Sequence, residues 1–361
     1  MRRAVLFAAL AFAACAGARG QAKAPAQEGL CVVRDVAYGP RGDAPGEGGA
    51  RAHRSGQFFD VLSDARAAVD APVYVHLHGG AWCQPFDKDG ESLAFFRRLV
   101  ARGFVVVNAN YQLQNDVTAP GAPPPRRARA TFRDMLRDVD DLGAFLARDF
   151  LPRRGLAPRA CALGGVSAGG HLALLYAYDQ GNPSARGARL RHALRVDVAV
   201  AVAAPADLAG EAFVAPLFGR RAPFGTRLDA AGAARLLTLL GWLADEDLPG
   251  MRARGDEAGV RAALARFSPA RLVTPRAVPT VLAYARRFPF AQSDGCVPTR
   301  DYDDLRARLE RAGVPVAGAL RTFRAHGALR AADMEALADQ VAAFARRASR
   351  PETAKGKDET R

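Results

Sequence analysis

Lysine is scarce in this chain of 361 residues: it supplies four of the 51 basic side chains, and arginine supplies the other 47. The formal net charge of +14 is therefore carried by arginine along the whole chain. Proteins that bind nucleic acid gather their charge on one face and add aromatic side chains that stack on bases. The densest arginine clusters, at residues 126–133 and 346–350, have only Phe132 and Phe344 as aromatic neighbours. We therefore expect no nucleic-acid partner.

Cysteine and histidine are rare too, with five and six residues. None of them has the spacing of a zinc site, and the chain has neither a glycine-rich phosphate loop nor a dinucleotide fingerprint. The sequence thus predicts no metal and no cofactor. Without Cys15 four cysteines remain, and their spacing alone assigns no disulfide. Cys161 lies within an apolar run and is expected to be a small core residue.

The apolar run at the start of the chain is too short to cross a bilayer. A basic start followed by apolar residues 4–14 matches a secretory signal peptide over residues 1–20. Cleavage would follow residues 16–18 or fall near Gly20. The alternative is lipidation of Cys15, which is the only membrane attachment that we expect. Both alternatives predict an exported protein, either secreted or periplasmic.

Strand and helix patterns alternate along the chain with no internal repeat. Apolar, β-branched runs that lack polar alternation mark strands covered on both faces. Such runs lie at residues 73–77, 104–109, 160–165, 196–202, 278–283 and 316–322, after two shorter strands at 30–36 and 58–61 that flank a glycine-rich loop at 39–56. Helical patterns lie at 91–101, 131–147, 168–178, 302–312 and 331–348.

This alternation predicts an α/β fold with a mostly parallel, doubly wound sheet and helices on both faces. We expect this domain at residues 28–350 and a disordered tail at 351–361. The interval 208–271 is longer than the other connections and has helical patterns of its own at 230–243 and 257–267. We interpret the interval as a helical cap inserted over the carboxyl ends of the strands.

Ser167 lies in the segment GVSAG at residues 165–169, between a predicted buried strand and a predicted helix. A serine at such a turn adopts a strained backbone, and it needs flanking glycines because side chains there would collide with the strand and the helix. Its hydroxyl is then exposed above a helix N-terminus, which favours negative charge. Ser167 is therefore the candidate nucleophile.

The segment HGGAW at residues 78–82 follows another predicted strand. Successive small residues let the chain bend so that N–H groups point toward the serine hydroxyl, as an oxyanion hole requires. Gly80 and Ala81, with Gly79 before them, are the candidate donors in this loop. The amide of Ala168, directly after the serine, is a further candidate.

The two large side chains of this loop have different expected roles. We expect His78 to fix the loop rather than to carry a proton, because motifs of this type place the histidine behind the loop. Trp82 is a candidate substrate-binding residue. Packing in the core is the alternative for Trp82, and both interpretations are open.

Two further polar segments each follow a predicted strand. Asp294 lies in SDGCVP at residues 293–298, and His326 is followed by glycine. With Ser167 they give the chain order Ser, Asp, His, which is the order that α/β-hydrolase triads use. The histidine would take the serine proton, and the aspartate would orient the imidazole. Asp207, after an earlier strand, is a rival acid, and we prefer Asp294.

The motifs HGGAW, GGVSAGGH and DGCVP and the final HG resemble those of α/β-hydrolase carboxylesterases related to hormone-sensitive lipase and to the kynurenine formamidase group. The resemblance covers residues 31–347. It implies Ser167 as the nucleophile, Asp294 as the acid and His326 as the base. It also implies that Gly79, Gly80 and Ala81 lie in the oxyanion loop.

The chain departs from this resemblance at three positions. Ala81 stands where the lipase-related type often has a third glycine, and Ala328 follows the final HG where an aromatic residue is frequent. Gln112 stands where these families usually have arginine. The first two departures concern the shape of the pocket, and the third concerns a contact behind it.

The resemblance implies a serine esterase that cleaves carboxylic esters of small or medium-sized molecules through an acyl-enzyme. The HGG-x-W form also occurs in formamidases, so an arylformamidase-type amide hydrolase is an alternative, although predicted export favours the esterase. A binding protein with a catalytically weak hydrolase fold is a third alternative. The presence of all three triad candidates argues against it, because binding alone places no demand on them.

Overall fold

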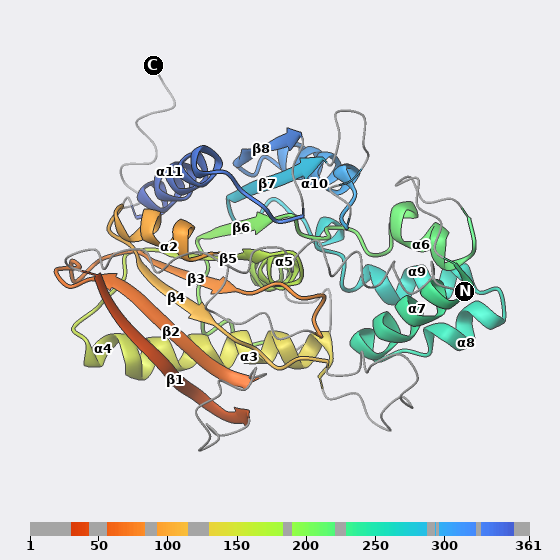
Figure 1. Ribbon diagram of the computed structural model, residues 1–361, viewed down its shortest axis with the longest axis horizontal. Coiled ribbons are helices and arrows are strands. Elements are labelled where there is room, and N and C mark those ends of the chain that lie inside the picture. Colours follow the sequence, from red (N-terminus) through yellow and green to blue (C-terminus); the bar gives the residue numbers. More distant parts are fainter. Residues whose placement is uncertain are drawn as a thin grey trace.

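The computed structural model describes most of the chain: residues 30–42, 56–83, 92–114, 130–182, 190–220, 229–286, 293, 296–322 and 326–349. These residues form a single eight-stranded sheet in the order β1-β2-β4-β3-β5-β6-β7-β8 (Figure 1). The predicted signal peptide at 1–20, with Cys15, and the predicted tail at 351–361 lie outside the described residues and stay predictions.

The central strands agree closely with the apolar runs. The strands are β1 (Leu30–Gly42), β2 (Gly56–Asp64), β3 (Val73–Leu77), β4 (Val105–Ala109), β5 (Cys161–Val166), β6 (Val198–Val202), β7 (Thr280–Arg286) and β8 (Val316–Thr322). β4, β3, β5, β6, β7 and β8 pair in parallel, whereas β1 and β2 pair antiparallel at one edge and β2 joins β4 antiparallel. The prediction of a mostly parallel sheet is confirmed.

The first strand is longer than its apolar pattern predicts. β1 was expected to end at residue 36, before a loop from 39, but its pairing with β2 continues until Gly42 lies opposite Gly56. Two irregularities in the ladder absorb the extra residues. At the first, Asp35 has a positive φ of 55°, and its N–H donates to Asp60 Oδ1 at 2.7 Å. Backbone pairing therefore continues where the apolar pattern stops.

Every predicted helix is present, and three short ones, α4, α6 and α8, were not predicted. The helices are α2 (Leu93–Val100), α3 (Phe132–Phe145), α4 (Leu151–Arg153), α5 (Ala168–Gly181), α6 (Glu211–Leu217), α7 (Ala230–Ala244), α8 (Leu248–Ala253), α9 (Glu257–Ala265), α10 (Thr299–Arg311) and α11 (Ala331–Ala348). A π-helical turn joins α3 to α4. The start of α3 is fixed by a capping box, in which Thr131 and Asp134 each accept a hydrogen bond from the other's backbone N–H.

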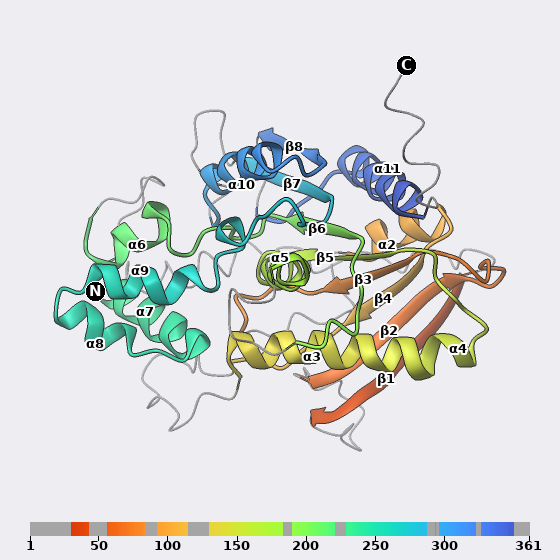
Figure 2. The ribbon, with the colours of Figure 1, turned by 180° about the vertical axis from the view of Figure 1, so that it is seen from behind.

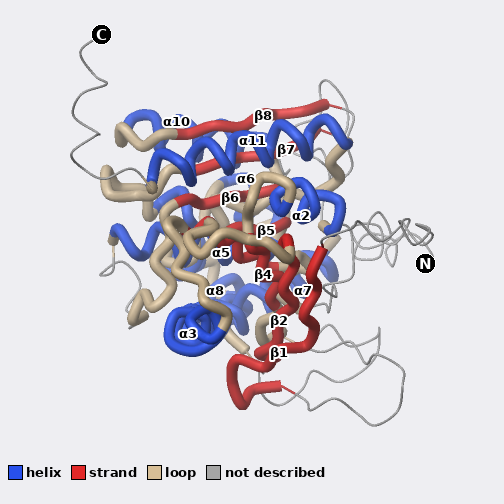
Figure 3. The backbone as a smooth tube through the Cα atoms, turned by 90° about the vertical axis from the view of Figure 1, so that its left-hand side faces the viewer, coloured by secondary structure: helices blue, strands red, loops and turns tan. Residues whose placement is uncertain are grey.

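Alternate side chains of each central strand point to opposite faces of the sheet. Val75 and Val107 belong to the core that also holds α3, α5 and α10, which lie in front of the sheet in Figure 2. Tyr74 and Val106 belong to a second core beneath α2 and α11. In Figure 3 β4 and β5 pass between α3 and α2. Helices thus cover both faces, which explains the unbroken apolar runs.

The helices α6, α7, α8 and α9 gather beyond the carboxyl ends of β3 and β6, on the right of Figure 1. All four fall in the interval 208–271, whose role as a cap stays a prediction. The sequence did not predict α6, which contains Pro216, or α8, which begins next to Pro249. Asp247 starts α8 by accepting the N–H of Gly250 at 2.9 Å. Among the described helices, none has both the length and the hydropathy that a membrane span needs.

Candidate active site

Ser167 occupies the sharp turn between β5 and α5, where the motif predicted it. Its φ of 53° and ψ of −119° lie outside the regions that L-residues favour. The Ser167 N–H donates to the carbonyl of Val202 on the neighbouring strand at 2.8 Å. This bond ties the strained residue to the sheet and leaves its half-buried side chain at the carboxyl edge.

Glycines allow this turn because the backbone of the preceding loop rests against it. A methyl group on Gly169 would overlap the carbonyl oxygens of Leu77 and His78, and one on Gly165 would overlap that of Leu77. We call residues 165–169 the elbow, and we call residues 78–82 the oxyanion loop after the role that the sequence predicts for them. The two segments are in backbone contact, which only glycine permits at these positions.

The oxyanion loop runs beside the serine in an unusual conformation. A methyl group on Gly79 would lie 3.4 Å from Ser167 Cβ, so this part of the loop borders the side chain. Gly80, Ala81 and Trp82 have positive φ angles of 108°, 48° and 61°. Two of these three residues carry side chains, and left-handed backbone costs such residues about 1–2 kcal/mol each. Strain of this kind is found most often at functional sites.

His78 supports the loop from behind, as expected. Its ring stacks on Tyr111 at 4.5 Å, its Nδ1–H donates to the Gly79 carbonyl at 2.7 Å, and the Tyr111 hydroxyl donates to the His78 carbonyl at 2.9 Å. Burial lowers the pKa of His78 to about 4, although the hydrogen bond to Gly79 acts in the opposite direction. His78 is therefore neutral at pH 7.

Trp82 points into the core. Its side chain is 6% exposed and makes edge-to-face contacts with Phe132 at 5.4 Å and with the His171 ring at 5.1 Å. The structure places the indole as the packing alternative expects. Its backbone still shapes the end of the oxyanion loop, because the Trp82 carbonyl accepts the N–H of Gln114 at 2.8 Å.

His326 meets Ser167 although the two residues are 159 positions apart. Its Nε2 lies 2.8 Å from Ser167 Oγ, a hydrogen-bond distance. Gly327, with a φ of 70°, follows directly, and a methyl group there would lie 2.8 Å from Val166 Cγ1. The glycine of the HG motif thus lets the histidine loop close over the elbow. Two of the three predicted triad residues are brought together.

The structure describes only one of the two candidate acids. Asp294, the preferred acid, lies outside the described residues, and so does Gly295. Asp207 forms a two-point ion pair with Arg271, at 2.8 Å and 3.1 Å. It also accepts the N–H of Ala209 at 3.2 Å. The carboxylate of the rival acid is thus engaged at the base of the predicted cap.

Sequence reasoning missed a buried carboxyl group near these loops. Asp301, in the first turn of α10, is 4% exposed and accepts the N–H of Ala206 at 2.6 Å and of Asp207 at 3.3 Å. Burial raises its pKa to about 8, although both backbone donors lower it. In the sequence Asp301 is an ordinary aspartate at a helix start. No local signal marks its burial.

Gln112 occupies the place where the resemblance expects arginine, and it still contacts an acid. Its N–H and its side-chain amide donate to the Asp138 carboxylate at 2.8 Å and 3.0 Å. The side-chain amide of Gln57 donates to the same carboxylate at 3.0 Å. Amide donors therefore support the segment behind the oxyanion loop.

Comparisons with known proteins identify the fold that carries this site. Residues 59–214 match the family model BD-FAE. An inhibited form of esterase B from Lactobacillus rhamnosis superposes with a TM-score of 0.60, at 17% identity over 97% of this chain and 96% of that chain. The chain has the α/β-hydrolase fold. No match was found among curated proteins.

Two further solved structures share the α/β-hydrolase fold with this chain. A truncated carbohydrate esterase from gut microbiota has a TM-score of 0.59, with 15% identity over 91% of this chain and 99% of that chain. A protein named DphMB1 has a TM-score of 0.55, with 20% identity over 94% and 92%. The fold prediction is confirmed by these likenesses together with the strand order.

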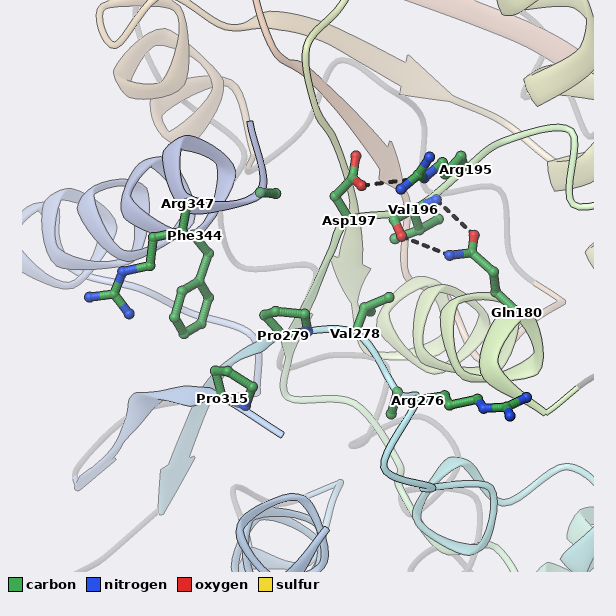
Figure 4. A pocket seen from close by; sticks show the side chains of 12 residues that line it. Gln180, Arg195, Val196, Asp197, Arg276, Val278, Pro279, Pro315, Phe344 and Arg347 are labelled. Atoms are coloured by element: carbon green, nitrogen blue, oxygen red, sulfur yellow. Dashed lines mark hydrogen bonds and ion pairs between the residues drawn. The ribbon is translucent and has the colours of Figure 1, made fainter. Parts of the chain in front are cut away.

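A pocket lies at the opposite edge of this α/β-hydrolase sheet, away from Ser167 (Figure 4). It is lined by Val196, Pro279 and Pro315, which precede β6, β7 and β8, and by Phe344 near the end of α11. Strands of this fold carry their functional loops at the carboxyl edge, so we do not assign this pocket to the site. Among the described residues no group of three or more His, Cys, Asp or Glu side chains could hold a metal ion.

The contact between the elbow and the oxyanion loop predicts the effect of one methyl group. Gly169→Ala should destabilise the fold by about 3 kcal/mol or more, since backbone atoms would have to move. Gly313→Ala is the matched control: its φ is 70° and nothing lies within 4 Å, so only about 1–2 kcal/mol of backbone strain is expected. Urea unfolding measures both. If the two variants lost the same free energy of unfolding, the close approach of the Leu77 and His78 carbonyls to Gly169 would be contradicted.

The buried His78 predicts a loss of stability in acid. Its pKa is about 6.5 in the unfolded chain and about 4 in the folded one, so the unfolded state binds more protons between these values. Stability is therefore lost as the pH falls from about 6.5 to about 4. Between pH 7 and 4.5, wild type should lose on the order of 2 kcal/mol more than His78→Asn. Equal losses in urea unfolding would show that His78 does not titrate in this way.

Proposed function

We propose that this α/β-hydrolase is a serine esterase that cleaves carboxylic esters of small or medium-sized molecules. The observation that carries the proposal is the 2.8 Å contact between Ser167 Oγ and His326 Nε2 at a strained strand-to-helix turn. A histidine at this distance can take the serine proton as the hydroxyl attacks a carbonyl carbon. The fold also supports the proposal, because two of the solved structures that share it are esterases.

In the proposed reaction Ser167 Oγ bonds to the ester carbonyl carbon while His326 takes its proton. The negative charge that forms on the carbonyl oxygen is stabilised by N–H groups of the oxyanion loop, from among Gly79, Gly80 and Ala81, and by the N–H of Ala168. His326 then gives the proton to the departing alcohol. A water molecule, activated by the same histidine, releases the acid from the acyl-enzyme.

Asp294 completes the proposed triad by orienting His326 and by stabilising its charged form. Its position in the chain supports this role, because its loop follows β7, the strand next to β8 and the His326 loop. Asp207 is less suited, since its carboxylate is engaged with Arg271. The proposal therefore keeps Asp294 as the acid.

Replacing the proposed nucleophile tests the mechanism. Ser167→Ala should lower turnover of a short-chain nitrophenyl ester by about 10⁶-fold, because no acyl-enzyme can form. A fluorophosphonate should label Ser167 in the wild type. Ser349→Ala, at the far end of α11, is the control and should keep full activity. A labelled residue other than Ser167, with activity retained in Ser167→Ala, would overturn the assignment.

The choice between the two acids is tested by a pair of substitutions. Asp294→Asn should lower kcat by about 10⁴-fold, since the imidazole loses its orienting carboxylate. Asp207→Asn should keep kcat nearly unchanged. Circular dichroism checks that both variants fold. If Asp207→Asn is the inactive variant, the acid lies after β6 instead.

The substrate class is tested with a panel of nitrophenyl esters of different acyl lengths that also includes N-formylkynurenine. The proposal expects ester hydrolysis to exceed formamide hydrolysis. A preference for the formamide would favour the arylformamidase alternative. Fluorophosphonate labelling of Ser167 without turnover of any of these compounds would favour a catalytically weak binding protein.

A further inference from the structure

Asp301 is a buried acid with no arginine or lysine partner among the described residues. Its carboxyl oxygen accepts two backbone N–H groups, from Ala206 and Asp207. Because its pKa is raised to about 8, the group is mostly neutral at pH 7 and offers an acceptor oxygen together with a hydroxyl donor. Burying a polar group costs free energy unless the group is hydrogen-bonded, and the two N–H donors offset part of this cost for Asp301.

The segment that Asp301 holds connects β6 to the first cap helix. We call residues 203–209 the cap hinge. On one side the hinge touches the first turn of α5, directly after the elbow: a methyl group on Gly170 would lie 2.9 Å from Ala204 Cβ. The Tyr284 hydroxyl donates to the Ala204 carbonyl at 2.5 Å. β7 and α10 therefore hold the hinge with one polar side chain each.

The far end of the cap interval closes on the same hinge. The N–H of Ala270 donates to the Ala206 carbonyl at 2.9 Å, and Arg271 pairs with Asp207. The N–H of Ala209 donates to Ser268 Oγ at 3.1 Å. Both ends of the interval 208–271 thus meet at the short stretch of backbone that Asp301 anchors. The chain leaves β6 for the cap helices through this hinge, and it returns past the hinge on its way to β7.

The elbow, in contrast, has supports of its own. Ser167 is held by the Val202 carbonyl, and Gly165 and Gly169 rest on the backbone of Leu77. None of these contacts passes through Asp301. Loss of the Asp301 carboxyl should therefore displace the cap more than it displaces the serine.

We infer that Asp301 is a positioning residue, which holds the cap at a fixed place over Ser167 and so sets the affinity for esters long enough to reach the cap helices. The inference rests on the proposed esterase function. The inference predicts that removing the Asp301 carboxyl raises KM for esters with long acyl chains, while kcat and the hydrolysis of acetate esters change little. A purely structural role would lower the active fraction for every substrate alike.

Steady-state kinetics of Asp301→Ala on nitrophenyl acetate and nitrophenyl octanoate test this effect, with active sites counted by fluorophosphonate. KM for the octanoate should rise about tenfold, since two buried N–H groups lose their acceptor, and kcat should stay within about twofold. Asp301→Asn should restore wild-type values, because its side chain offers the same acceptor and donor as the neutral acid. Asp303→Ala, at an exposed position of the same helix, is the matched control.

Hydrogen exchange gives a readout that needs no activity. In Asp301→Ala the amides of 203–209 and of α6 should exchange faster, while those of β5 and α5 stay protected. If Asp301→Ala does not fold, Ser268→Ala removes one of the two acceptors of the Ala209 N–H in the same hinge, leaving Asp207, and should act in the same direction with a smaller effect. Unchanged exchange in the hinge, or an equal loss of kcat on both esters with KM unchanged, would overturn the inference. A wild-type protein that cleaves no ester would overturn the proposed function and with it the effect on ester affinity, whereas the exchange measurement would still test separately whether Asp301 holds the hinge.

Discussion

The backbone of the oxyanion loop rests directly on the backbone of the elbow, and the position of Ser167 follows from this contact. The carbonyl oxygens of Leu77 and His78 occupy the space that a side chain at Gly169 would fill. The chain can make the approach only by turning sharply at residue 167, which places the serine in a left-handed conformation. The N–H groups of the loop and the serine hydroxyl are thereby held at one edge of the sheet.

Two polar groups near the site, His78 and Asp301, are held neutral by burial rather than paired with opposite charges. His78 has a depressed pKa and Asp301 a raised one, and in both cases loss of hydration is the largest cause. Neutral groups can hold backbone segments by hydrogen bonds without adding a charge next to the serine. The ion pairs of the predicted cap lie farther out, where Arg261 and Arg220 bridge Glu211 and Glu257.

The sequence predicted the parts of the fold that depend on repeated local patterns. Unbroken apolar runs identify β3 to β7 because both faces of these strands are largely buried, and the glycines around Ser167 show that the backbone turns there. β8 has a similar run and was expected to be covered on both faces, but it lies at the edge of the sheet and its residues 316–320 are only half-buried. The extension of β1 to Gly42 was not predictable, since it depends on ladder irregularities and on the Asp60 side chain. Asp301 was missed for the same reason: its burial arises from a hinge about a hundred positions earlier. The packing of Trp82 depended on Phe132 and the His171 ring, which no local pattern specifies.

The strand order also determines when the site can form. β3 lies between β4 and β5, and the β1–β2 pair joins the sheet only through β4. The last strand, β8, and the last helix, α11, border the loop of His326, whose contact with Ser167 spans 159 positions. Contacts between distant segments form late, because loop closure must precede them. Ester hydrolysis would therefore appear only after the carboxyl-terminal part of the chain has docked, so the recovery of activity during refolding reports the final step of assembly rather than the collapse of the core.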